Sequence, residues 1–404
     1  MSQAPWDFVL LSKPCIDLHI FSRLKENKMK KSLLALALLG AVAFSAQAGQ
    51  VTLYGTVDGG FQYTNAKTKF LGSEKLVETK TNTLQLADGL GDDNKFGLMG
   101  SEDLGNGLEV GFQLESGFHI ANGAMTGAPE EPGAKTILFD REARVYVKGS
   151  FGELAAGRVG SLGSASGSYD MFFANGDAFD GGDKIGSGFA GTDKLNNSLT
   201  YVTPDFGGFQ AYAQYSFSKV DDQKDKFNKN DRQWGLGATF SMDNFAVAAL
   251  VEQGIPATKN ADGTAVDPKE KKPISFGLGA NVKFDNVTVY AAGQYAKHPE
   301  GLAYGPDEIA SHFSNGIKNN IAFTLGTQIE VGQGNFTVAG YLAQAKLEAN
   351  NKKLQYMSLN GRYTYNLSDR TSVYVGADAG RAKNKATNEK ATMFTAYTGL
   401  THNF

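Results

Sequence analysis

The residue types that most often carry out chemistry are few in this 404-residue chain and poorly spaced for it. There is one cysteine, and there are five histidines. Ser116 and His119 lie three positions apart and could belong to a hydrolase, but no Asp or Asn is spaced to complete a catalytic triad. The Gly-rich run 160–168 (GSLGSASGS) lacks the signatures of a phosphate-binding loop. We therefore expect no catalytic residue, no cofactor and no enzyme activity.

Aspartates are the distinctive chemical feature. Four of them lie between Asp170 and Asp183 with no basic residue among them, directly after the small-residue run just described. Small residues permit the compact backbone of a loop that folds back on itself. Two acidic clusters, 89–94 (GLGDDN) and 176–183 (GDAFDGGD), could offer oxygen ligands to Ca²⁺, but neither has the twelve-residue calcium-loop pattern. We expect solvated loop acids here and no metal site.

The elements that must position these loops are strands with one apolar and one polar face. In the stretch 108–118 (LEVGFQLESGF) the apolar residues fall on even positions, whereas Glu109, Gln113 and Glu115 fall on odd ones. The same alternation returns at 274–284 and at 321–329. Forty-nine Gly, 16 Tyr and 27 Phe also favour β-structure with many turns over helix.

Short turns and long loops alternate between the predicted strands. Short turns rich in Gly, Asn and Asp are expected at 103–107, 149–153, 204–208, 241–244, 284–286, 332–335 and 366–370. Long polar loops are expected at 64–93, 120–138, 161–194, 219–231, 253–273, 298–318, 347–353 and 381–391. Seven hairpins, a first strand from Val51 and a last strand ending at Phe404 give sixteen strands in an up-and-down order.

A closed sheet of sixteen strands is too wide for side chains to fill, so its interior is water. Its polar faces then turn inward, and its apolar faces turn outward to lipid, where closure satisfies the backbone polar groups. We therefore predict an all-β, antiparallel transmembrane barrel with short periplasmic turns and long external loops. Aromatic residues beside the short turns, as in an interfacial girdle, support this fold: Phe151, Phe206, Phe209, Phe240, Phe245, Phe284, Phe336 and Tyr365.

The N-terminal region carries a targeting pattern. From Met29 the chain reads MKKSLLALALLGAVAFSAQA, which has the basic, apolar and small-residue regions of a secretory signal peptide, with cleavage expected after Ala48. We expect residues 1–28 to be a spurious extension, residues 29–48 to be the signal peptide, and residues 49–404 to be the barrel. The barrel segment has no cysteine, which suits an oxidising compartment. The small net charge of −3 gives no reason to expect a nucleic-acid partner.

Several stretches resemble the trimeric general porins of Gram-negative outer membranes, neisserial-type porins included. They are VTLYGTVDGGF (51–61), KFGLMGSEDLGNGLEVGFQLESGF (95–118), FDREARVYVKGSFGELAAGRVG (139–160), NNSLTYVTPDFGGFQAYAQYS (196–216) and TGLTHNF (398–404). The resemblance covers essentially all of the chain after the signal peptide. It implies an outer-membrane homotrimer through which small hydrophilic solutes and ions diffuse passively.

In that family the third long loop folds into the barrel, and its acids face basic residues of the wall. Carried onto this sequence, the loop spans about Gly160 to Lys194, with acids at Asp170, Asp177, Asp180, Asp183 and Asp193. The wall candidates that the resemblance implies are Lys95, Arg141, Arg158 and Lys194. Arg141 shares its parity with Ala143 and Val145, which should face lipid, whereas Arg144 shares that of Glu142. Two interpretations stay open: Arg141 sits at a bulge or rim, or Arg144 is the true pore residue.

The resemblance also implies that the terminal strand, with Leu400, His402 and Phe404 on one parity, is recognised by the barrel-assembly machinery. Outer-membrane lipid is the other expected partner. Two alternative functions remain at this stage. One is a ligand-specific channel, for which the sequence offers no file of aromatics along the lumen. The other is a barrel adhesin or receptor that acts through its external loops.

Processing gives the first prediction. Outer-membrane material should carry a mature N-terminus at Gly49, and no membrane-resident product should retain Trp6 or Cys15. Intact-mass measurement of the protein extracted from outer membranes checks this. Recovery of a membrane protein that keeps residues 1–28 would refute the assignment of Met29 as the natural start.

Overall fold

The computed structural model describes residues 51–71, 75–128, 136–181, 185–191, 193–219, 229–258, 271–302, 304–305 and 316–404. By internal contacts the chain divides into Met1–Ala48 and Gly49–Phe404, and each described residue belongs to the second unit. The extension 1–28 and the signal peptide 29–48 lie outside the described residues and stay predictions.

The described strands form one closed antiparallel sheet. Consecutive strands pair from β3 to β17, and β1 pairs with β17 on one side and with β2 and β3 on the other, which closes the ring. The elements are β1 (Val51–Leu71), β2 (Leu76–Asp88), β3 (Lys95–Gly105), β4 (Leu108–Gly117), β5 (Glu142–Gly149), β6 (Gly152–Gly160), α2 (Phe173–Gly176), β7 (Lys194–Val202), β8 (Phe209–Ser216), β9 (Arg232–Met242), β10 (Phe245–Ile255), β11 (Ile274–Phe284), β12 (Val287–Lys297), β13 (Ile317–Val331), β14 (Gly334–Leu347), β15 (Lys353–Ser368), β16 (Thr371–Asn384) and β17 (Lys390–Asn403).

The seventeen strand segments amount to sixteen barrel strands, because β2 and β3 share one place in the ring. Residues 59–71 of β1 pair with β2, and residues 51–56 pair with β3. The bend 89–94 therefore only interrupts one strand. The predicted sixteen-stranded meander is confirmed, and each of the seven predicted short turns joins two consecutive strands.

The fully buried carboxylate of Asp58 on β1 organises this interruption. One of its oxygens accepts the backbone N–H of Leu90 at 2.7 Å, and the other accepts that of Asp92 at 3.2 Å. The hydroxyls of Tyr374 on β16 and Thr401 on β17 donate to the same carboxylate at 2.8 and 2.5 Å. A buried charge requires several such donors, and here they come from both sides of the β1–β17 seam.

The sequence prediction of a long loop at 64–93 is wrong over most of its length. The chain continues as β1 to Leu71 and returns as β2 from Leu76. Thr64 lies opposite Thr83, and Thr68 lies opposite Thr79. These β-branched residues suit a strand, but polar residues occupy both faces of the hairpin, so no apolar alternation marks it in the sequence.

The burial pattern of the barrel is the reverse of that of a soluble domain. Leu325 on β13 is 65% exposed, whereas its neighbour Thr324 is 5% exposed. Leu359 on β15 is 61% exposed, whereas Asn360 is 1% exposed. Apolar side chains thus point outward and polar ones inward, as predicted. The aromatics beside the short turns also face outward, with Phe206 among the most exposed at 63%.

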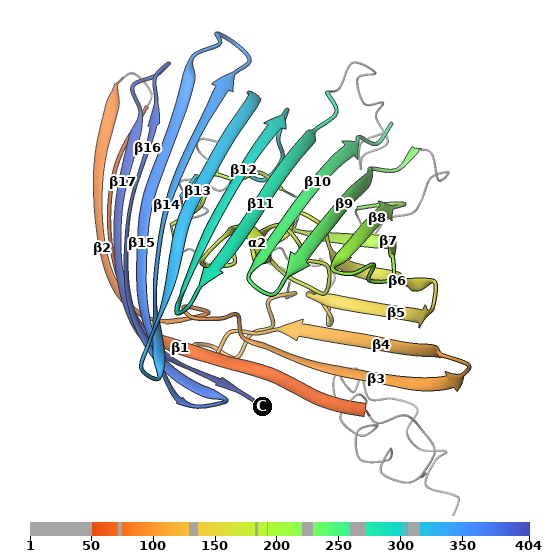
Figure 1. Ribbon diagram of the computed structural model, residues 1–404. Coiled ribbons are helices and arrows are strands. Elements are labelled where there is room, and N and C mark those ends of the chain that lie inside the picture. The colour runs from red at the N-terminus through yellow and green to blue at the C-terminus, as the bar shows by residue number, and fades with distance from the viewer. Residues whose placement is uncertain are drawn as a thin grey trace, which may run out of the picture. The chain divides into compact units, whose positions relative to one another are not determined.

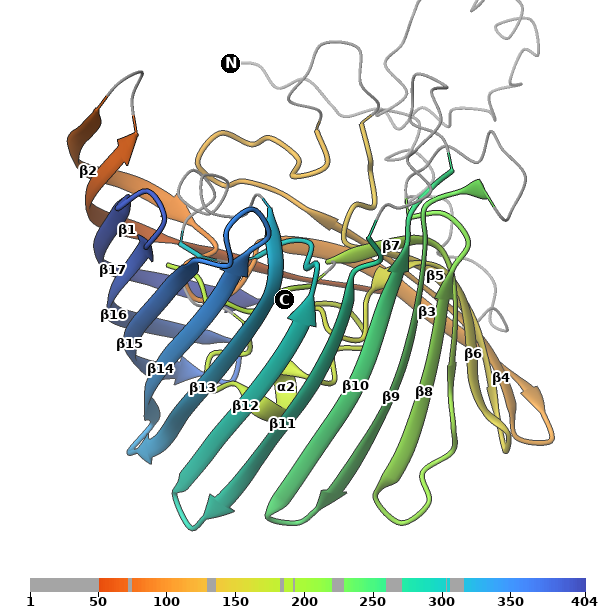
Figure 2. The ribbon, with the colours of Figure 1, turned by 90° about the horizontal axis from the view of Figure 1, so that it is seen from above.

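The predicted inward loop is the connection 161–193 between β6 and β7. Figure 1 and Figure 2, drawn at right angles to each other, both place its helix α2 inside the ring of strands. Contacts of α2 with β10, β11 and β12 agree with this position. No helix in the described part of the chain is long and apolar enough to cross a membrane.

The seam between β1 and β17 yields a prediction about Phe404. Its backbone N–H donates to Gly55 O at 3.0 Å, and its carbonyl accepts from Gly55 N at 3.1 Å. Its ring covers Gly55 so closely that a Cβ there would lie 2.5 Å from Cζ. Deleting Phe404 should therefore lower the yield of folded, heat-modifiable barrel several-fold, measured by semi-native electrophoresis against total protein. Phe404→Tyr, which keeps the ring and the backbone bonds, is the control; an undiminished yield after deletion would show that the seam does not need this residue.

Candidate pore constriction

A charged cavity of about 890 Å³ lies between the inward loop and a wall built from β1, the 89–94 bend, the starts of β3 and β5, β4 and β15. The loop contributes Asp170 and Asp180 to its lining, and the wall contributes Lys95, Glu115 and Arg141. This cavity brings together acidic and basic side chains of an aqueous interior.

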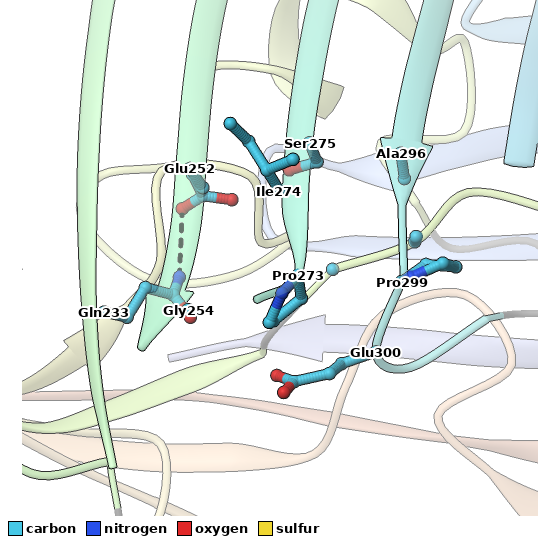
Figure 3. A pocket seen from close by; sticks show the side chains of 11 residues that line it. Gln233, Glu252, Gly254, Pro273, Ile274, Ser275, Ala296, Pro299 and Glu300 are labelled. Carbon is cyan, nitrogen blue, oxygen red and sulfur yellow. Dashed lines mark hydrogen bonds between the residues drawn. The ribbon is translucent and has the colours of Figure 1, made fainter. Parts of the chain in front are cut away.

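A second, much smaller pocket lies between loop residues 190–191 and the wall of β9–β12. Its volume is about 30 Å³, space for a few water molecules. Figure 3 shows Glu252 and Gln233 pointing toward each other in this pocket, with Gln233 Nε2 donating to Glu252 Oε1 at 3.5 Å. Of these two hollows, the one on the Lys95–Arg141 side of the loop is the larger.

An aromatic cluster fixes the loop against the wall. Phe172, Phe173 and Phe189 meet edge to face, with ring centroids 5.0 to 5.6 Å apart, and all three are buried. The inward-facing residues of the wall opposite these three rings are small. A Cβ on Gly279 would lie 3.0 Å from the Cα of Gly176, so the glycines let the loop backbone press flat against β11.

Polar anchors hold the loop at further points along its length. The carboxylate of Asp177 accepts the Tyr341 hydroxyl at 2.6 Å and the Gly181 N–H at 2.9 Å. Gln294 exchanges two hydrogen bonds of 2.7 Å with the backbone of Ala190, and Asn320 Nδ2 donates to Gly188 O at 2.9 Å. Fixed at these points on β12, β13 and β14, the loop presents a defined acidic edge to the cavity.

The predicted site residues divide into two groups. Lys95, Arg141, Asp170, Asp180 and Asp193 line the cavity. Those that lie elsewhere are Asp177, Arg144, Arg158 and Lys194, and Asp183 lies outside the described residues. Asp177 is 2% exposed and serves as an anchor, as described above.

The open question between Arg141 and Arg144 has a structural answer. Arg141 precedes β5, so the strand alternation does not yet apply to it. Its Nε lies 2.7 Å from Glu115 Oε1, and its Nη1 lies 2.8 Å from Asp93 Oδ2, beside the cavity. Arg144 also points inward but lies beneath the loop, where it contacts Glu142 at 3.0 Å and Glu153 at 2.7 Å.

The other two basic candidates, Arg158 and Lys194, lie next to the two ends of the loop. Arg158 donates to Asp140 O at 2.7 Å and to Asn196 Oδ1 at 2.5 Å. Lys194 pairs with Asp193 at 2.8 Å and contacts Ser166. Arg158 thus connects the segment before β5 with β7, and Lys194 contacts the loop at Asp193 and Ser166.

Sequence reasoning missed Arg362 on β15. Its Nη1 donates to Gly91 O at 3.2 Å, and its guanidinium lies 5.3 Å from the ring centroid of Phe179. It lines the cavity beside the bend 89–94. Its parity is that of the inward Ser358 and Asn360, and this signal could have identified it.

Two acids at the edge of the loop interact with each other. Burial and the neighbouring Asp180 carboxylate raise the pKa of Asp170 to about 8. Burial likewise raises the pKa of Asp180. Like charges held close together cannot both ionise easily. Near neutral pH the Asp170 carboxyl is therefore largely protonated.

Comparison with known proteins agrees with this geometry. A family model described as Gram-negative porin matches residues 35–387. An outer membrane porin protein of Bordetella pertussis is 32% identical over 409 residues, covering 93% of this chain and all of that protein. Among solved structures, an anion-selective porin from Comamonas acidovorans superposes with a TM-score of 0.59 at 23% identity over 88% of this chain and all of that one. OmpT of Vibrio cholerae in a trimer form gives a TM-score of 0.54 at 13% identity, with the same coverage of both chains.

The last two likenesses support the fold alone. The family match spans most of the chain, and the Bordetella relative is similar over its whole length. A closed sixteen-stranded barrel with a charged aqueous passage is what such proteins require. The chain belongs to the Gram-negative porins, the channel-forming barrels of the bacterial outer membrane.

Proposed function

We propose that small hydrophilic solutes and ions cross this outer-membrane porin through the cavity between the acidic edge of the inward loop and the basic wall. One observation carries the proposal. The cavity in front of the loop has a volume of about 890 Å³, and its lining brings acids of the loop opposite bases of the wall. In this proposal a solute crosses between Asp170 and Asp180 on one side and Lys95, Arg141 and Arg362 on the other.

Opposite charges across a narrow aqueous slot create a transverse field. The low-dielectric barrel wall strengthens that field relative to open water. Polar solutes can align their dipoles with it, whereas apolar solutes must displace ordered water. Such a passage selects by size and polarity without a dedicated binding site, which supports general diffusion over ligand-specific transport.

The balance of lining charges supports a preference for cations. The acids outnumber the bases by seven to three: Asp92, Asp93, Glu115, Glu142, Asp170, Asp180 and Asp193 against Lys95, Arg141 and Arg362. The raised pKa of Asp170 reduces this excess but does not reverse it. Fixed charge in a pore lining sets ion preference in this way.

Three features of assembly belong to the same proposal. The chain acts as a homotrimer, which its family resemblance and the trimer form of a protein with the same fold support. The signal peptide 29–48 directs it to the periplasm and is cleaved after Ala48. The barrel-assembly machinery then recognises Leu400, His402 and Phe404, and the folded barrel contacts outer-membrane lipid. Outward exposure of Leu400 and Phe404, 42% and 43%, leaves both accessible to such recognition.

Charge substitution at the passage tests its function. Asp170→Asn with Asp180→Asn should shift the reversal potential in a salt gradient toward anions, because negative charge leaves the loop edge. We expect roughly a twofold change in the cation-to-anion permeability ratio. Lys95→Gln with Arg362→Gln should shift the potential the other way. Planar-bilayer recording measures both.

The control is Asp243→Asn, which removes an exposed charge at the short turn between β9 and β10. It should leave both selectivity and single-channel conductance unchanged. If the Asp170→Asn, Asp180→Asn variant, like Asp243→Asn, leaves both selectivity and single-channel conductance unchanged, this loop is not the constriction. Liposome swelling with a graded series of sugars distinguishes a general pore from a ligand-specific channel or a closed adhesin barrel.

The pH dependence follows from the raised pKa of Asp170, about 8. As pH rises through that value the Asp170–Asp180 pair loses its shared proton and gains a negative charge. Cation preference should therefore increase between about pH 7 and about pH 9, a range in which ordinary carboxylates are already ionised. Reversal potentials recorded across this range check it. The step should vanish in the Asp170→Asn, Asp180→Asn variant, and its persistence there would assign it to another group.

A further inference from the structure

Arg144 on β5 connects the barrel wall to the inward loop. Its side chain is only 10% exposed. Nη1 donates to Glu153 Oε1 on β6 at 2.7 Å and to the hydroxyl of the loop residue Tyr169 at 2.8 Å. Nη2 donates to Gln113 Oε1 on β4 at 3.2 Å, and Nε lies 3.0 Å from Glu142 Oε1. One guanidinium thus joins three neighbouring strands to the loop.

Tyr169 is the loop residue that Arg144 holds. It is buried, and its hydroxyl also donates to Glu153 Oε1 at 2.7 Å. The centroid of its ring lies 5.2 Å from the Arg144 guanidinium, which also lies 4.8 Å from the ring centroid of Tyr146. A charge-assisted hydrogen bond and a cation–π contact therefore act together on the side chain of Tyr169.

The residues on either side of Tyr169 link this contact to the passage. On one side, Ser168 donates from its backbone N–H to Glu142 Oε2 at 3.2 Å and from its hydroxyl to Gln113 Oε1 at 3.0 Å. On the other side, Asp170 lines the charged cavity. Consecutive Cα atoms are about 3.8 Å apart. The position of Tyr169 therefore limits where Asp170 can lie.

The loop before Tyr169 is flexible by composition. Residues 163–168 (GSASGS) have no side chain larger than that of serine. Gly167 has a φ of +94°, in the left-handed region that glycine adopts readily. From Phe172 onward the loop is fixed by its aromatic cluster and by the anchors on β12, β13 and β14. Tyr169 is thus the first large side chain after Leu162, and it lies between the flexible part of the loop and the fixed part.

The geometry of this contact requires an arginine. A planar guanidinium has five donors in fixed directions, so it can bond Gln113, Glu153 and Tyr169 at the same time, whereas a lysine ammonium is a single point charge. The charge of Arg144 is balanced by the carboxylates of Glu142 and Glu153, at 3.0 and 2.7 Å. Arg144 therefore affects the passage through the position of the loop more than through its own field.

We propose that Arg144 is a positioning residue for ion selectivity, which acts through Tyr169 to hold Asp170 at the acidic edge of the passage. The inference rests on the proposed function of the cavity and deepens it. When the bonds to Tyr169 are lost, the segment 163–168 lets the edge move away from the basic wall. The slot then becomes wider, and the field across it becomes weaker, since Coulomb energy falls with distance.

The first test removes one hydroxyl and no charge. In planar-bilayer recording, Tyr169→Phe should shift the reversal potential toward anions, about half as far as Asp170→Asn with Asp180→Asn does. It should also raise single-channel conductance and open-channel noise, because the edge is less fixed. A residue that only stabilised the barrel would leave selectivity unchanged. Tyr212→Phe is the matched control with no expected shift, since its hydroxyl bonds Gln210 of its own strand, β8, at 3.4 Å.

The second test separates position from charge. Arg144→Lys keeps the positive charge but loses the fixed directions of the guanidinium, so it should shift the reversal potential in the same direction as Tyr169→Phe. In the Asp170→Asn, Asp180→Asn background, Tyr169→Phe should add no further shift, because the acids that it positions are absent. Semi-native electrophoresis should show a heat-modifiable barrel for every variant, since the β1–β17 seam keeps all its residues.

Two results would overturn the inference. In the first, Tyr169→Phe and Arg144→Lys both keep the wild-type reversal potential although Asp170→Asn with Asp180→Asn changes it. The passage would then stand, and Arg144 would not position its edge. In the second, Tyr169→Phe acts as strongly in the background without the two acids, which would assign its effect to another group. A silent Asp170→Asn, Asp180→Asn variant would contradict the proposed function itself and this inference with it.

Discussion

Lipid cannot hydrogen-bond the backbone, and the rest of this structure depends on that constraint. A sheet that crosses the membrane must close, because an open edge would leave N–H and C=O groups without partners in hydrocarbon. Here closure occurs where β1 meets β17 over the register from Thr56 opposite Asn403 to Lys69 opposite Lys390. The alternation of side chains then follows: residues such as Leu325 and Leu359 must face outward, and Thr324 and Asn360 must face inward.

Closure at sixteen strands creates an interior that is too wide for side chains to fill, and the loop 161–193 folds into it. Helix α2 of this loop packs against β10, β11 and β12, and the charged cavity lies between the loop and another part of the wall. Its aromatic cluster needs a smooth surface, which the inward glycines and alanines of β10 to β13 provide. The composition of the barrel therefore serves two purposes. Glycine on one wall admits the loop, whereas charged residues on the other wall define the passage.

The sequence predicts most of the fold, because the short turns and the two-residue alternation are local signals. It fails for the β1–β2 hairpin, where both faces are polar and no alternation is visible. It identifies the loop that forms the passage edge but not the role of each acid on it, since nothing local distinguishes Asp177, an anchor to Tyr341, from Asp180. Arg141 does not follow strand parity because it precedes β5. The parity of Arg362 marks it as inward, but its position beside the bend 89–94 depends on barrel closure, which no local pattern records.

One segment, the bend 89–94, contacts both the seam that closes the barrel and the basic residues that line the cavity. Asp58 accepts hydrogen bonds from Tyr374 and Thr401 at the seam and, on the same carboxylate, from the backbone of the bend 89–94. That bend holds Asp92 and Asp93 against Lys95 and Arg141, at 3.2 and 2.8 Å. The polar network that closes the barrel therefore also fixes the basic wall of the passage. A rigid wall keeps its charges at constant distances from the loop edge, and such constancy is what allows a wide barrel to maintain a defined field across its narrowest part.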